Sequence, residues 1–154
     1  MAQRDSEAGA LKRLSMDGWD GYAASRDRIL GHVARRNIGN VVVLTGDVHA
    51  HYAAELKADF DDPASNTIGT EFVGTSISSG GDGADMPSNA SVLLGENPHI
   101  KFVNTQRGYV VCDLTHRRWR TDYKTVPYVT TPGAPISTRA SFTVRGDAPG
   151  LEEG

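Results

Sequence analysis

The sequence predicts an α/β chain of the α+β kind, in which one helix–strand unit is followed by mostly antiparallel strands. Apolar residues recur at helical spacing within residues 23–36, and a continuous β-branched run follows at residues 40–45. Several later segments alternate apolar and polar residues, which is the period of half-buried strands. Such an arrangement fits part of a two-layer sheet architecture. We therefore expect exposed strand edges if the chain stands alone.

The first half of the chain contains the helix and three strands. In the helix, Ile29, Leu30 and Val33 share one face, and Asn37 is a stop signal. The strands of this half are predicted at residues 40–45, 51–60 and 67–74.

In the second half, a long loop precedes further strands. Residues 75–89 are rich in Ser, Gly and Asp, and Ser88 or Asn89 is expected to cap a short helix that runs through Leu94. Residues 127–135 read as an extended connection, and the last strand is expected at a sheet edge. The strands of this half are predicted at residues 100–103, 109–115, 119–126 and 141–145.

The length of 154 residues suits one domain with a modest core. Residues 16–146 are predicted to form this domain, after a loose segment at residues 1–15 and before a mobile tail at residues 147–154. The hydrophobic content is 38%, and no apolar run reaches the length needed to span a bilayer, so we expect no membrane partner.

Charge and cysteine content exclude other classes of protein. The net charge of -3 argues against a specific nucleic-acid binder, for which a basic surface is expected. Met1 to Ser6 lack the apolar core of a secretory signal, so the default expectation is a cytoplasmic chain. Cys112 is the only cysteine, which excludes an internal disulfide and a thiolate cluster, and we expect it to be a small buried hydrophobe.

The most informative segment is the end of the β-branched run. The run stops at Gly46, and Asp47 and His49 follow at once. Ligands of open α/β sheets bind beyond the carboxyl ends of strands, and a carboxylate with an imidazole suits a mixed metal centre. The alternatives are an Asp that caps a turn and a hydrogen-bonded loop His. His51 is a weaker candidate that could point to solvent.

Three further groups of residues are candidate sites. Trp19 and Tyr22 lie among Gly and Asp before the helix, where aromatics commonly anchor a loop onto a core. Residues 80–85 resemble a calcium loop but lack the spacing and closing Glu of an EF-hand, so we expect a flexible loop, with substrate contact as the alternative. Arg107, before Gly108, is a candidate anion contact.

Five motifs follow one another along the chain. They are WDGY at residues 19–22, NVVVLTGDVH at 40–49, EFVGTSISSGG at 71–81, NPHIKF at 97–102 and RGY at 107–109. A helix with Arg26 and Arg28 follows the first motif, and Trp119 and Asp122 follow the last. In this order the motifs resemble the C-terminal part of the alkaline phosphatase D (PhoD-like) family.

This resemblance implies a fold and an activity. The fold would be the C-terminal part of a calcineurin-like metallophosphoesterase β-sandwich flanked by helices. The activity would be hydrolysis of phosphate monoesters and diesters with iron (Fe3+) and calcium (Ca2+), in a periplasmic or secreted enzyme. Asp47 and His49 would supply part of the metal centre, and Trp19 and Tyr22 would lie near the substrate opening.

The chain departs from the family pattern in length. Family members carry a longer N-terminal half with an export signal, a β-domain and further ligands, including an iron-binding cysteine, and Cys112 lies in the wrong motif to be that residue. We therefore expect weak metal affinity and little turnover from the chain alone. The alternatives are a non-catalytic remnant or subunit that needs a separate N-terminal half, and a β-rich binding module.

Overall fold

The computed structural model describes residues 17–154, so the segment at residues 1–15 that was predicted to be loose lies outside the described part. The predicted α+β class is confirmed, with two sheets and mostly antiparallel strands. The helical elements are η1 (Trp19–Tyr22), α1 (Ala23–Arg35) and α2 (Ala90–Glu96). No helix between residues 17 and 154 has the length and apolar character needed to cross a membrane.

The first sheet has the strand order β1-β3-β2-β4. Its strands are β1 (Val42–Thr45), β2 (His51–Lys57), β3 (Thr67–Val73) and β4 (Ile100–Asn104). β1 pairs parallel with β3, while β2 pairs antiparallel with both β3 and β4. β1 therefore has a sheet neighbour on one side only within the described part, and its carboxyl end opens into the segment that joins it to β2.

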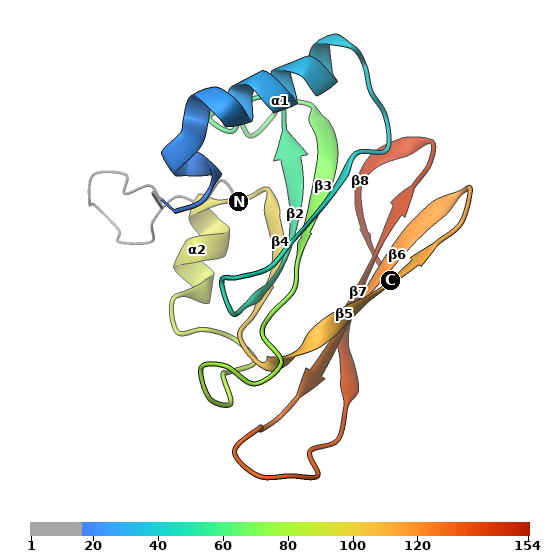
Figure 1. Ribbon diagram of the computed structural model, residues 1–154. Helices are drawn as coiled ribbons and strands as arrows, with labels where there is room; N and C mark the ends of the chain where they lie inside the picture. The colour runs from blue at the N-terminus through green and yellow to red at the C-terminus, as the bar shows by residue number, and fades with distance from the viewer. Residues whose placement is uncertain (1–16) are drawn as a thin grey trace.

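The second sheet follows sequence order, β5-β6-β7-β8, and all its pairs are antiparallel. Its strands are β5 (Arg107–Leu114), β6 (Arg118–Val126), β7 (Ser137–Arg145) and β8 (Ala148–Glu153). Figure 1 shows this sheet on one side of the first sheet and the two helices on the other.

Two apolar clusters hold these layers together. Between the sheets, Tyr123 has no exposed surface, and its hydroxyl donates to the Tyr52 carbonyl at 2.5 Å. Around it, the buried residues of the cluster are Ala53, Phe72, Phe142 and Val144. The other cluster lies between α2 and the first sheet and contains Ala54, Ala90, Leu93, Ile100 and Val103. Both faces of the first sheet are thus covered, and the last five residues of β3 are all buried.

Two expectations for the second sheet need correction. Residues 147–154 were predicted to be a mobile tail, but β8 covers most of them and pairs with β7, so β8 and not β7 is the edge strand. Pro149 and Gly150 made a strand seem unfavourable in the sequence, although an edge strand tolerates proline. Cys112 was expected to be buried but is exposed, because it lies on the outer part of the edge strand β5.

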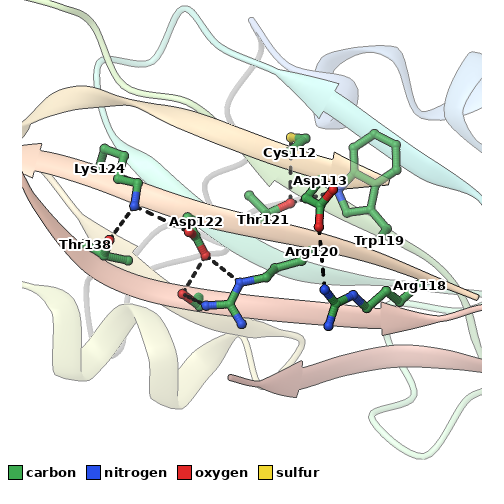
Figure 2. Close-up of polar contacts among 10 residues, drawn as sticks. Cys112, Asp113, Arg118, Trp119, Arg120, Thr121, Asp122, Lys124 and Thr138 are labelled. Atoms are coloured by element: carbon green, nitrogen blue, oxygen red, sulfur yellow. Dashed lines mark hydrogen bonds and ion pairs between the residues drawn. The ribbon is translucent and has the colours of Figure 1, made fainter. Parts of the chain in front are cut away.

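A polar network centred on Asp122 covers the outer face of the second sheet (Figure 2). Its carboxylate accepts hydrogen bonds from the Ser141 hydroxyl at 2.7 Å and from Arg120 Nε at 2.8 Å, and Lys124 Nζ lies 3.4 Å away. These contacts, with the Ser141 bond first, lower the pKa of Asp122 below its ordinary value. The network joins the neighbouring strands β6 and β7.

We predict that Asp122→Asn lowers the free energy of unfolding by about 1 kcal/mol at pH 7. Because the folded-state pKa of Asp122 is depressed, its contribution is present above the unfolded pKa of about 3.9 and is lost as the pH falls through the folded pKa. Urea unfolding at several pH values measures this difference. Asp113→Asn, which removes an exposed ion pair to Arg118, is the matched control. A difference that persisted at low pH would contradict the assignment.

Candidate functional site

The segment between β1 and β2, residues 46–50, has an unusual backbone. Asp47 and His49 both adopt positive φ, at 72° and 53°. The Val48 N–H donates to the Gly46 carbonyl at 2.9 Å, which closes a γ-turn around Asp47 of the rare, strained form. Left-handed backbone costs a residue with a Cβ roughly 1–2 kcal/mol, although Asp and His adopt it more readily than most.

The side chains of Asp47 and His49 are exposed at the carboxyl end of β1. Within residues 17–154, neither side chain makes a hydrogen bond or an ion pair. A turn-capping Asp would accept a bond from its own loop, so this alternative has no support in the structure. The carboxylate of Asp47 and the imidazole of His49 therefore remain available to bind a group from outside the described residues.

Asp47 and His49 could supply two of the ligands of a metal centre, but two ligands do not complete one. A carboxylate suits hard cations such as calcium, and an imidazole with a carboxylate suits iron. Among the described residues, no group of three or more His, Cys, Asp or Glu side chains could hold a metal ion. A complete centre at this edge therefore needs ligands from elsewhere.

Trp19 and Tyr22 lie on η1, the short helix that leads into α1. Trp19 is half-buried, whereas Tyr22 is 64% exposed. In the described chain, no hydrogen bond joins either aromatic to Asp47 or His49, so their contact with a substrate stays a prediction.

Glu71 was missed as a candidate in its own right. It lies on β3 with 3% of its surface exposed, and burial raises the pKa of its carboxyl group. Its signal in the sequence was a single acidic residue within the apolar strand predicted at residues 67–74. This carboxyl group accepts a hydrogen bond at 3.2 Å from the hydroxyl of Thr45, the last residue of β1.

His51 does not point to solvent as the sequence suggested. It is the first residue of β2 and has no exposed surface, because its side chain faces the second sheet and lies edge-on to Tyr123. Its Nδ1 accepts the Thr75 N–H at 3.2 Å, and burial lowers the pKa of the imidazole to about 4. His51 is therefore a neutral core residue at neutral pH.

Arg107 is not placed to bind an anion from solvent. It is the first residue of β5 and only 3% exposed. Nη1 donates to the Ser76 hydroxyl at 2.7 Å and to the Ser79 carbonyl, and Nη2 donates to the carbonyls of His49, at 2.9 Å, and Thr105. Both of its Nη groups are thus used within the protein, and Nη2 binds the candidate metal-binding segment, whereas the buried Nε has no partner among the described residues.

The segment at residues 80–85 was expected to be a flexible loop, but contacts of two of its side chains attach it to the fold. The Asp82 carboxylate accepts the N–H groups of Val129 and Thr130 at 2.7 and 3.1 Å. Asp85 accepts hydrogen bonds from Arg139 and from Asn104. These bonds lower the pKa of both carboxyls. Both acids are engaged with protein donors.

A hollow of about 690 Å³ lies at the other end of β1, between the end of α1 and the β7–β8 turn. Its charged lining residues are Lys57 and Asp147, and the rest of its lining is polar or apolar. This hollow lies away from the candidate ligands Asp47 and His49, which follow the carboxyl end of β1.

Comparison with known proteins agrees with the resemblance seen in the sequence. The family model described as PhoD-like phosphatase matches residues 1–123. Alkaline phosphatase D of Bacillus subtilis (strain 168) is 53% identical over 139 residues, which cover 90% of this chain and 24% of that protein. A solved structure of PhoD has a TM-score of 0.93 and 50% identity, and the match covers 99% of this chain and 29% of that one. The chain thus spans about a quarter of the length of these relatives.

We predict different costs for alanine at two left-handed glycines of the loop. A Cβ at Gly83 would lie 1.8 Å from the Thr105 carbonyl oxygen, whereas a Cβ at Gly81 would meet nothing within 4 Å. Gly81→Ala should therefore cost only the backbone strain of about 1–2 kcal/mol. Gly83→Ala should cost about 1–3 kcal/mol more through the added clash. Thermal unfolding of both variants checks this, and equal costs would show that the loop does not pack against Thr105.

Proposed function

The chain belongs to the PhoD-like phosphatase family, and from this membership we propose that it forms part of a metal-dependent hydrolase of phosphate esters. The match to the family covers most of the chain, and the candidate metal donors lie within it. Phosphate monoesters and diesters are the proposed substrates, and iron and calcium are the proposed metals. When bound, such ions polarise a phosphoryl group and lower the pKa of a water molecule.

The role of this chain is to supply metal donors at the carboxyl end of β1. Asp47 would contribute a carboxylate oxygen and His49 an imidazole nitrogen. The supporting observation is that both residues adopt strained, left-handed backbone while their exposed side chains make no contact within residues 17–154 that would explain it. Tyr22 would offer its exposed hydroxyl to a substrate oxygen at the opening, and Trp19 would lie beneath it.

A second candidate function is that of a subunit or remnant that needs further polypeptide for activity. The specific observation is the exposed apolar surface on two strands at sheet edges. On β1, Leu44 is 54% exposed, and on β5, Tyr109, Val111 and Leu114 are also exposed. Open edges of this kind are templates for pairing with another chain. The proposed partner is the polypeptide that corresponds to the rest of the relatives' length.

We predict that Asp47→Asn and His49→Gln each lower metal content and turnover by more than about 100-fold. Removal of a residue that only supports a metal ligand lowers metal affinity or activity by about 10–100-fold, and removal of the ligand itself should lower them further. The protein tested is this chain assembled with a polypeptide corresponding to the remaining part of the Bacillus subtilis relative. Elemental analysis measures bound iron and calcium, and release of nitrophenol from aryl phosphate mono- and diesters measures turnover.

Asp113→Asn and His116→Gln are the matched controls, since both side chains are exposed and lie near the β5–β6 turn, away from β1's carboxyl end. Undiminished metal content and turnover in the Asp47 and His49 variants would refute the site. The same assay on the chain alone separates the two candidate functions: turnover without the added polypeptide would exclude dependence on a partner.

A further inference from the structure

Arg107 carries a charge in the protein interior without an acidic partner. Its guanidinium is buried, and between residues 17 and 154 no carboxylate lies within ion-pair distance of it. A buried cation is normally paired with an acid or fully hydrogen-bonded. Here the partners of Nη1 and Nη2 are three main-chain carbonyls and one hydroxyl, while the buried Nε has no hydrogen-bond partner among residues 17–154. This side chain therefore binds backbone dipoles instead of a counter-ion.

These acceptors come from three different parts of the chain. The His49 carbonyl belongs to the segment after β1, Ser76 and Ser79 belong to the loop after β3, and Thr105 precedes β5. Figure 1 shows the segments that follow β3 and that join β4 to β5 at the same end of the first sheet. We call residues 76–83 the serine–glycine loop. One side chain thus joins this loop to the segment that bears the candidate ligands.

The contact to His49 acts on the strained residue itself. His49 has a φ of 53°, and its carbonyl accepts Nη2 of Arg107 at 2.9 Å. A bond from a charged donor is stronger than one between neutral groups, and it fixes the direction of that carbonyl. Fixing the carbonyl limits the rotation of the peptide that follows His49. Arg107 thereby favours the conformation in which the imidazole is presented at the end of β1.

The serine–glycine loop packs closely around the guanidinium. A Cβ at Gly80 would lie 3.2 Å from Nη1 of Arg107 and 3.7 Å from Nδ1 of His49, and a Cβ at Gly83 would lie 3.0 Å from Nη2. Both glycines also have positive φ. The loop therefore borders Arg107 and the His49 imidazole at once, with little room for side chains between them.

We propose that Arg107 is a positioning residue that locks the His49 main chain and couples the metal-binding segment to the serine–glycine loop. It touches neither metal nor substrate, and it acts through the carbonyls that it binds. The inference deepens the proposed function, since it takes His49 as a metal ligand. A cation held at His49 would then depend on the order of this loop.

The first experiment is amide hydrogen exchange on the metal-free full chain. Arg107→Met removes the charge and the donors, and Arg107→Lys keeps the charge but loses the planar pair of Nη groups. Arg117→Met, at an exposed arginine of the β5–β6 turn, is the control. We expect exchange in residues 46–50 and in the serine–glycine loop to rise together by at least about tenfold in both Arg107 variants, with β6 and β7 unchanged.

A uniform rise over the whole chain would show a merely structural role, and no rise in either segment would overturn the proposal. If Arg107→Met fails to fold, Arg107→Lys decides, because a lysine ammonium cannot reach all four acceptors in the planar geometry of a guanidinium.

The second experiment uses the assembled phosphatase described above. In Arg107→Lys, the calcium or iron concentration that gives half-maximal activity should rise by about 10–100-fold, while turnover at saturating metal stays within about threefold of the parent. Loss of turnover at saturating metal with an unchanged metal requirement would contradict a positioning role. If His49→Gln retains its metal, the proposed function fails, whereas the exchange experiment still tests the link between the two segments.

Discussion

The donation of Arg107 to main-chain carbonyls is the constraint on which the arrangement of the site depends. Arg107 begins β5, the first strand of the second sheet, yet its guanidinium lies among segments that follow β1 and β3 of the first sheet. Buried carbonyls need donors, and here one planar group supplies several of them. The carboxyl end of β1 is therefore fixed by a residue of the opposite layer, in addition to its own pairing with β3.

The sequence predicted the parts of the fold that local signals determine. The apolar spacing of Leu30 and Val33 predicted α1 almost to its ends, and the β-branched run predicted β1 and the position of Asp47 beyond it. β8 was missed because Pro149 and Gly150 read as a tail, and its strand exists through pairing with β7. The exposure of Cys112 likewise depends on what the opposite sheet covers, which alternation alone does not show.

For the site, composition and spacing located the candidate donors but not what holds them. Nothing near His51 in the sequence distinguishes a surface imidazole from one packed against Tyr123, since the two residues are brought together only by the two-sheet packing. The role of Arg107 depends on acceptors up to 58 residues away, so it could not be read from its own neighbours. Positive φ at Asp47 and His49 is also invisible in the sequence, because neither residue type requires it.

The backbone of the β1–β2 segment supplies an argument for function that is independent of family. Glycine would adopt the left-handed conformation at positions 47 and 49 without the roughly 1–2 kcal/mol that a Cβ adds to each. An acid and an imidazole that only filled a turn would gain hydrogen bonds in return, and within the described chain their side chains gain none. At His49, Arg107 stabilises this backbone through the carbonyl, and both side chains are exposed at a sheet edge where Leu44 is also exposed. The proposed metal centre at this edge would account for both features, with its remaining ligands supplied by polypeptide other than residues 17–154.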